Sequence, residues 1–278
     1  MRYNDIIIQS RQNPLLCECV SLQKKRERDE KGLFLIDGVK LSCEYIRYIG
    51  EPLYLFVLES CRDKYHEHLC ALERECGLSL TATLVSEGAF MKLTDQKAPD
   101  GIIAVGECSK LCVELVSEGQ SFDFSSERII ALSSLRDAGN VGTVIRSALA
   151  LGYDRIIMSS DCADIFNPKT LRATMGAAFS MRFAVCESLS FVVERLVCAG
   201  RRVYCAEIRE NARPLDEIEI SESDVFVVGN EGHGIDTAVS SVSTSSVYIP
   251  ISSRSESLNA AIAASLLMWH QRTKTFSK

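Results

Sequence analysis

Short apolar runs alternate with segments of helical periodicity along almost the whole chain, and this alternation constrains the fold more than any other feature. Apolar runs of about four to eight residues are typical of buried strands, and strands separated by helices favour a largely parallel sheet covered on both faces. The sequence therefore predicts an α/β fold. Strands are expected at residues 33–36, 53–58, 81–85, 102–105, 129–132, 155–158, 203–206, 225–228 and 247–249, and helices at 14–31, 39–48, 63–76, 87–93, 141–151, 168–175, 189–199 and 257–270.

The alternation is interrupted by a polar stretch at residues 108–127 that has no sustained period. A chain of 278 residues is long enough for two domains of about 100–200 residues each. We therefore expect a smaller α/β domain at residues 1–107, a linker at 108–127 and a second α/β domain at 128–278.

Composition narrows the class of protein. No apolar run approaches the roughly 20 residues that cross a bilayer, and the first residues lack the pattern of a secretion signal. We expect a cytoplasmic protein without a membrane partner. The 12 cysteines include no pair of CxxC units, which argues against structural zinc, so we expect no metal and interpret them as small hydrophobic residues in a reducing compartment.

The formal net charge of −6 provides no global attraction to nucleic acid. The whole acidic excess lies in residues 1–127, so any RNA must be held by local basic patches. The basic run in the first helix is either such a patch or an ordinary solvated helix face. The candidate RNA contacts are Lys24, Lys25, Arg26 and Arg28 in the first domain and Arg136, Arg172 and Arg254 in the second.

Three segments of the second domain combine a predicted strand end with glycine or polar residues. The first joins a strand to a helix and contains Asn140, Gly142 and Arg146. The apolar residues of this helix form one stripe, and Arg146 lies roughly 150° from its centre. Taken alone, the segment is more typical of a capped surface helix with a solvated arginine.

The second segment runs from an apolar strand into a loop with Gly229, Gly232 and Gly234. Ligands of α/β sheets bind at the carboxyl ends of strands, where glycine lets the backbone come close to them. The spacing matches neither the GxGxxG fingerprint nor a P-loop, and a simple glycine-rich turn is the alternative. Glu231 is unusual in such a turn.

The third segment leaves a strand at Ile249-Pro250, passes through a polar loop and enters a long helix. Ser257 is predicted to cap this helix, whose sequence AAIAASLLMWH is apolar around almost its whole circumference, so we expect the helix to be buried. The need to satisfy the N–H groups of a buried helix end would by itself explain Ser257 and Asn259.

In this order and spacing, the three segments resemble the motifs of the SpoU, or TrmH-type, branch of the SPOUT RNA methyltransferases. The resemblance comprises N-x-G-x-x-x-R at 140–146, G-N-E-G-x-G at 229–234 and I-P…S-L-N at 249–259. Residues 13–14, 34–38 and 98–102 are similar to the ribosomal-protein-like substrate-binding domain of that family. The resemblance therefore covers almost the whole chain.

The resemblance implies a SPOUT-type α/β domain with a trefoil knot, a smaller N-terminal RNA-binding domain, and a homodimer. It implies transfer of a methyl group from S-adenosylmethionine to a ribose 2′-hydroxyl. The implied cofactor-binding residues are Gly229, Asn230, Gly232, Ile249 and Leu258. The implied catalytic residues are Asn140, Arg146, Glu231, Ser257 and Asn259. A guanidinium is normally fully protonated, so we expect Arg146 to anchor RNA phosphate and stabilise developing negative charge rather than to accept a proton.

Ribosomal RNA is favoured over transfer RNA because relatives with a similar first domain often act on it. A transfer RNA methyltransferase and a catalytically silent RNA-binding homologue of the same fold are the alternatives. Many relatives have Met and Gly after the proline of the third motif, where this chain has Ile251 and Ser253, and this departure bears on cofactor affinity. A dinucleotide-binding enzyme would need GxGxxG followed by an acidic residue about 20 positions on, and the sequence has no such unit.

Overall fold

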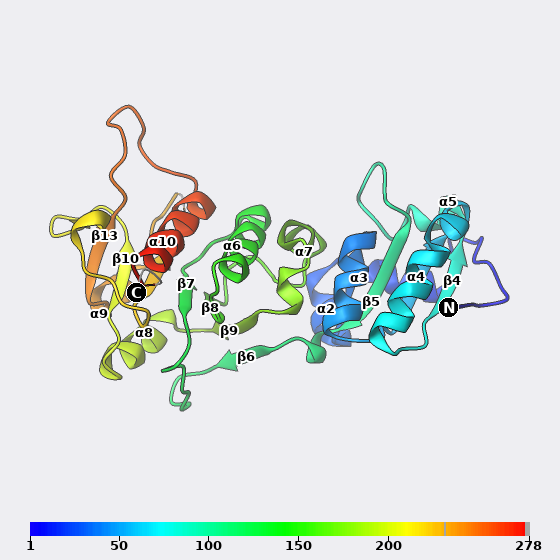
Figure 1. Ribbon diagram of the computed structural model, residues 1–278, viewed down its shortest axis with the longest axis horizontal. Coiled ribbons are helices and arrows are strands. Elements are labelled where there is room, and N and C mark those ends of the chain that lie inside the picture. Colours follow the sequence, from blue (N-terminus) through cyan, green and yellow to red (C-terminus); the bar gives the residue numbers. More distant parts are fainter. Residues whose placement is uncertain (231, 276–278) are drawn as a thin grey trace. The chain divides into compact units, whose positions relative to one another are not determined.

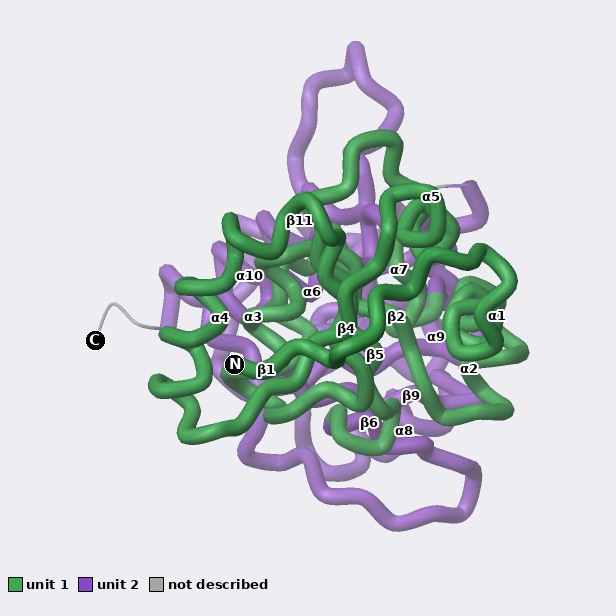
Figure 2. The backbone as a smooth tube through the Cα atoms, turned by 90° about the vertical axis from the view of Figure 1, so that its right-hand side faces the viewer, with its two compact units in different colours: residues 1–111, 164–180 green, residues 112–163, 181–278 purple. Residues whose placement is uncertain are grey.

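The computed structural model of the 278-residue chain describes residues 1–230 and 232–275. The chain forms two compact units, residues 1–111 with 164–180 and residues 112–163 with 181–278 (Figure 2). The first unit thus takes in a segment from the middle of the predicted second domain. None of the helices in the described ranges is long and apolar enough to span a membrane.

The first unit, all of whose residues are described, contains a five-stranded sheet in the order β1-β4-β3-β5-β2. β4 is parallel to β1 and β3, whereas β5 is antiparallel to β2 and β3. The four longer strands confirm the predicted ones, and the predicted helix at 14–31 is two helices. The elements are β1 Arg2–Tyr3, α1 Pro14–Ser21, α2 Lys25–Lys31, β2 Leu33–Asp37, α3 Val39–Tyr48, β3 Tyr54–Leu58, α4 Arg62–Cys76, β4 Thr81–Val85, α5 Glu87–Phe90 and β5 Ile102–Glu107.

Residues 164–180 join the first unit through charged contacts. They include α7, Pro168–Thr174, which carries Arg172. The Arg172 guanidinium forms ion pairs with Asp37 at 3.2 Å and with Asp95 at 2.8 Å. Asp37 is 4% exposed, so its charge needs such a partner. Arg172 therefore holds α7 in place within this unit and is not a free surface cation.

Arg28 has a structural place that the sequence did not reveal. Its side chain is 2% exposed and is ion-paired with Asp164. It also donates hydrogen bonds to the carbonyl oxygens of Leu22 and Gln23, at 2.8 and 3.0 Å. These carbonyls lie between α1 and α2, where the chain leaves the helix and loses its own hydrogen bonds. Arg28 therefore lies outside any solvent-facing basic patch, contrary to its prediction as an RNA contact.

The second unit contains, in its described part, an eight-stranded sheet in the order β11-β13-β10-β12-β7-β8-β9-β6. All neighbouring strands are parallel, which confirms the predicted sheet type. The strands β6, β9 and β11 and the helix α9 were not predicted. The elements are β6 Val113–Val116, β7 Ile129–Leu132, α6 Ala138–Ala150, β8 Arg155–Ser159, β9 Arg182–Cys186, α8 Leu189–Cys198, β10 Val203–Ala206, β11 Arg213–Pro214, β12 Val225–Val228, α9 Thr237–Val242, β13 Ser245–Tyr248 and α10 Ala260–Thr275.

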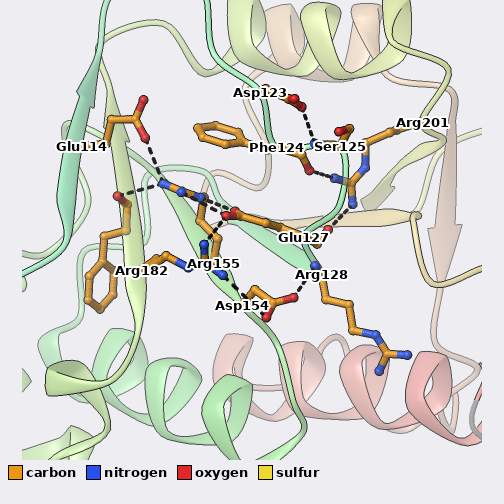
Figure 3. A network of polar contacts seen from close by, with 11 residues as sticks. Glu114, Asp123, Phe124, Ser125, Glu127, Arg128, Asp154, Arg155, Arg182 and Arg201 are labelled. Carbon is orange, nitrogen blue, oxygen red and sulfur yellow. Dashed lines mark hydrogen bonds and ion pairs between the residues drawn. The ribbon is translucent and has the colours of Figure 1, made fainter. Parts of the chain in front are cut away.

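Much of the expected linker at 108–127 is integrated into the second unit. β6 pairs with β9, and buried arginines hold the residues that follow it (Figure 3). Arg155 is ion-paired with Glu127 and, at 3.1 Å, with Glu114. Arg201 donates hydrogen bonds to the carbonyl oxygens of Phe124 and Glu127. The carboxylates and carbonyls of this polar stretch are thus partners of buried guanidinium groups.

Helices α6 and α10 lie side by side and run in the same direction. Asn140 contacts Asn259 near their starts, and further along Ser265 donates a hydrogen bond to Ser147 at 3.0 Å. At their far ends, Arg272 donates to the carbonyl oxygen of Leu151 at 2.9 Å. The N-termini of both helices therefore lie at the same edge of the sheet.

The prediction that α10 is buried all round is wrong. Leu267 and Met268 are completely buried. Ile262, Leu266 and Trp269, however, are 50%, 41% and 56% exposed. These three lie at helical spacing, so they form one apolar stripe on the solvent side of α10.

Candidate active site

A cavity of about 400 Å³ lies at the carboxyl ends of β10, β12 and β13 and is bordered by the start of α10. The loops that leave β12 and β13 form much of its wall; the second of these is the long excursion before α10 (orange, Figure 1). Five residues predicted from the second and third motifs line it, namely Gly229, Asn230, Ile249, Ser257 and Leu258. The structure therefore brings the second motif, residues 229–234, and the third, residues 249–259, into one site.

Gly229 is needed because the loop folds back onto it. A Cβ atom at this position would lie 2.5 Å from the carbonyl carbon and oxygen of Gly234 and 2.7 Å from the side chain of Ile235. The close approach is fixed by a backbone bridge, in which the N–H groups of Asn230 and Gly234 each donate to the other residue's carbonyl oxygen, at 3.0 and 2.9 Å. Gly234 has φ +71°, which also favours glycine.

The Asn230 side chain organises this loop. Its Nδ2 donates to the carbonyl oxygen of Ser134, beyond the end of β7, at 3.1 Å. Its Oδ1 accepts from the N–H groups of Gly232 and His233 at 2.8 and 3.3 Å. Gly232 is exposed and is not among the described residues that line the cavity. Asn230 therefore ties the loop to the neighbouring strand, and the position of Gly232 does not support its predicted contact with cofactor.

Asn259, and not Ser257, caps α10. The Asn259 Oδ1 accepts from the N–H groups of Ala261 and Ile262 at 3.0 and 3.2 Å, which satisfies the first turn of the helix. Its Nδ2 donates to Oδ1 of Asn140 at 2.9 Å. Ser257 lies before the helix, where it is exposed and lines the cavity. The first and third motifs thus meet through two asparagines.

Arg146 faces solvent on α6, as its position on the helical wheel predicts. The apolar stripe of that helix, by contrast, is completely buried. Arg146 is not among the described residues that line the cavity, and no described side chain forms an ion pair with it. Its guanidinium is therefore available to an external anion. Glu231 lies outside the described residues.

Sequence reasoning missed part of the cavity wall. Glu207 and Ile208 follow β10, and Glu256 precedes Ser257. β10 is hydrogen-bonded to both β12 and β13, so its end has to lie between the two loops. No local signal marks Glu207 and Ile208, because their place at the cavity follows from strand order, whereas Glu256 lies within the third motif.

Comparison with known proteins agrees with the geometry. The profile of the SpoU rRNA methylase family matches residues 127–269, and that of the MRM3-like substrate binding domain matches residues 13–104. The 23S rRNA (guanosine(2553)-2′-O)-methyltransferase RlmP of Bacillus subtilis (strain 168) is 31% identical over 95% of this chain and 98% of its own. The chain belongs to the SpoU rRNA methylase family.

Two further relatives span most of this family member. The 23S rRNA (uridine(2479)-2′-O)-methyltransferase of Streptomyces viridochromogenes is 26% identical over 89% of this chain and 85% of its own. The AdoMet-bound rRNA methyltransferase from Sinorhizobium meliloti is 25% identical, with a TM-score of 0.78 over 98% of this chain and 99% of that one. The motif-based prediction is confirmed: the chain is an rRNA 2′-O-methyltransferase that uses S-adenosylmethionine.

The cavity of this SpoU enzyme fits its cofactor. Its volume lies within the range of about 300–1,000 Å³ that is usual for small-molecule sites. Val228, Ile249 and Leu258 give the cavity apolar walls, and Gly229 lets the loop close at its edge. Glu207 and Glu256 add two carboxylate groups, which can accept hydrogen bonds, to the cavity wall.

The other predicted RNA-contact residues of the SpoU enzyme differ in whether they pair with a carboxylate of the chain. Lys24, Lys25 and Arg26 are exposed, although Arg26 pairs with Glu30 one turn further along α2. In the second unit Arg254 and Arg136 are exposed, and Arg136 pairs at 3.1 Å with Asp161. Burial acts to raise the pKa of Asp161, but hydrogen bonds from Ser159, Ser134 and Arg136 outweigh it and lower that pKa, so the carboxylate stays charged.

Proposed function

We propose that this enzyme methylates the 2′-hydroxyl of a guanosine in 23S rRNA, the reaction named for the Bacillus subtilis relative. One observation carries the proposal at the level of the site: residues of the second and third motifs line a single cavity, and Asn259 links that cavity to Asn140 of the first motif. The guanosine is favoured over the uridine of the Streptomyces relative because the similarity to the Bacillus protein is greater in both identity and coverage.

Each motif residue has a proposed part in this reaction. Gly229, Ile249 and Leu258 hold the cofactor, which when bound supplies a methyl group on a sulfonium centre. Asn140 and Asn259 position the reacting ribose beside the start of α10, where the helix N-terminus favours developing negative charge.

The proposed part of Arg146 follows from its protonated guanidinium, which cannot act as a base and binds phosphate strongly. We assign it the RNA phosphate next to the reacting ribose. The hydroxyl of Ser257, which is exposed at the cavity, is assigned a hydrogen bond to the substrate. On the motif match alone, Glu231 is assigned a part in orienting Arg146 or Asn140.

RNA binding is assigned to both units. The region matching the substrate binding domain contributes the exposed Lys24, Lys25 and Arg26, and the second unit contributes Arg136 and Arg254. Within the proposed domain division of 1–107, 108–127 and 128–278, Arg172 supports the first region by pairing with Asp37 and Asp95. Because the overall charge is −6, we expect binding to depend on these few cations and to weaken steeply with salt.

A trefoil knot, a homodimer and a cytoplasmic location complete the proposal. The knot is supported by the two loops after β12 and β13, which border one cavity, as expected of knotted loops that hold a cofactor. The dimer is supported by the stripe of Ile262, Leu266 and Trp269, since such an apolar row on a helix is typical of an interaction surface. Sedimentation of a Trp269→Glu variant should show monomers, and an unchanged dimer would place the interface elsewhere.

Mapping of 2′-O-methyl groups tests the reaction. RNA from cells lacking the gene, incubated with the purified enzyme and S-adenosylmethionine, should gain one methyl group at a 23S rRNA guanosine. A methylated transfer RNA or uridine would redirect the substrate assignment. Cofactor binding without methylation of any RNA would favour the silent homologue. Arg146→Lys should lose most activity, with Arg195→Lys on α8 as a matched surface control, and retained activity would show that the guanidinium shape does not matter.

A further inference from the structure

Glu207 lies outside the three motifs, yet it has a central place in the cofactor cavity. It follows β10 directly, and β10 lies between β12 and β13 in the sheet. Its backbone N–H donates to the carbonyl oxygen of Val247 at 3.0 Å, which fixes the point where the chain leaves the sheet. The side chain is only 12% exposed. Glu207 therefore lines the space between the loops of the second and third motifs.

The two carboxylate oxygens of Glu207 differ in their contacts. Oε1 accepts a hydrogen bond from the Ser246 hydroxyl at 2.9 Å and is ion-paired with Nε of Arg209, also at 2.9 Å. No described residue donates a hydrogen bond to Oε2. Ser246 and Arg209 therefore fix the side chain by one oxygen and leave the other for a ligand.

We propose that Oε2 of Glu207 accepts a hydrogen bond from a ribose hydroxyl of S-adenosylmethionine. Arg209 already neutralises the carboxylate, so a cationic ammonium or sulfonium group gains little there and is repelled by the guanidinium. A neutral hydroxyl donor meets no such repulsion. The arrangement parallels a general feature of nucleotide-binding α/β sheets, in which an acidic residue at the end of a strand next to the glycine loop receives the ribose hydroxyl.

The second carboxylate of the cavity wall differs from Glu207. Glu256 is exposed and, within the described ranges, forms no ion pair. Its charge is therefore uncompensated, and it suits the cationic end of the cofactor better than the ribose. Glu256 is an internal comparison for the ribose contact, because both residues line the same cavity.

Calorimetric titration separates the proposal from the cofactor assignment on which it rests. The ligands are S-adenosylhomocysteine and its 2′,3′-dideoxy counterpart. Wild-type enzyme should bind the dideoxy compound at least about tenfold more weakly, the usual effect of losing a hydrogen bond to a charged group. Glu207→Ala should bind S-adenosylhomocysteine about tenfold more weakly than wild type and should no longer distinguish the two ligands. Glu207→Gln keeps the side-chain volume and a neutral acceptor, so its affinity for S-adenosylhomocysteine should lie between those of wild type and Glu207→Ala.

The controls are Glu210→Ala, three positions further along the same exposed loop, and Glu256→Gln. Both should keep the wild-type preference for the ribose hydroxyls, and thermal melts should show that every variant is folded. If Glu207→Ala and Glu207→Gln discriminate as wild type does, other groups bind the hydroxyls and the proposal is overturned. If wild-type enzyme binds neither ligand, the cofactor assignment itself fails, which is a distinct result.

Discussion

The contact between Gly229 and Gly234 allows a sharp test of the cofactor loop. In Gly229→Ala the new Cβ would lie 2.5 Å from backbone atoms that cannot rotate away, so the loop must either strain around the clash or open the bridge between Asn230 and Gly234. If the bridge stays closed, overpacking of this kind costs about 1–3 kcal/mol. If the bridge opens, the clash is relieved but two hydrogen bonds of about 0.5–1.5 kcal/mol each are lost. Either route costs about 2 kcal/mol. If only the closed loop binds cofactor, the apparent Kd for S-adenosylhomocysteine should rise about 30-fold.

Gly232→Ala is the matched control for this prediction. The nearest atom to a Cβ at that position is Oδ1 of Asn230 at 3.4 Å, an ordinary contact at the end of a side chain. Calorimetric titration of Gly232→Ala should therefore give a Kd close to the wild-type value, and the melting temperature of this variant should hardly change. Wild-type affinity in Gly229→Ala, or an equal loss in both variants, would show that the closed loop is not the binding-competent form.

Three further predictions concern stability and reactivity. Asn259→Ala removes the cap of α10 and should lower the free energy of unfolding, measured by denaturant titration, by about 1 kcal/mol. Asn259→Ser should restore part of this loss. An unchanged free energy of unfolding in Asn259→Ala would contradict the capping role. Burial, and then Lys274, lower the pKa of His270, so the unfolded chain binds its proton first as the pH falls. The free energy of unfolding should therefore decline below about pH 6.5, and this decline should be smaller in His270→Gln. An equal decline in both proteins would show that another group is responsible. Burial raises the pKa of Cys186 to about 12, so alkylation followed by mass spectrometry should modify the exposed Cys17 long before Cys186, and equal rates would contradict the packing.

The hydrophobic pattern was sufficient for most of the buried strands and for the parallel sheet of the second unit. It failed where an element depends on a distant partner. β1 is two residues long and exists because it pairs with β4, and β6 lies in a polar stretch that is held by β9. β9 itself, Arg182–Cys186, is a short apolar run that the pattern could have revealed. Pairing across the sheet, rather than local propensity, decides such short strands.

Burial of charge was also hidden from the sequence. Lys25, Arg26 and Arg28 belong to one basic run, yet only Arg28 turns inward, because Asp164 and two free carbonyl groups lie beneath it. Asp164 is 136 residues away along the chain. A helix of apolar composition gave the opposite error, since α10 exposes Trp269 in the single chain. In both cases the periodicity predicted the helix correctly but did not predict which groups, or solvent, each face of the helix contacts.

Strand order explains why the three motifs identify the reaction but not the whole site. Cys205 of β10 is in register with Val227 of β12 on one side and with Ser246 of β13 on the other, so Glu207 emerges between the two motif loops. Side chains alternate between the faces of a strand, and a shift of β10 by one residue would turn Glu207 away while leaving both loops in place. The motif residues can thus stay unchanged while the ribose contact is gained or lost. Differences in cofactor affinity between members of this family should therefore be sought at the end of β10 as well as in the motifs.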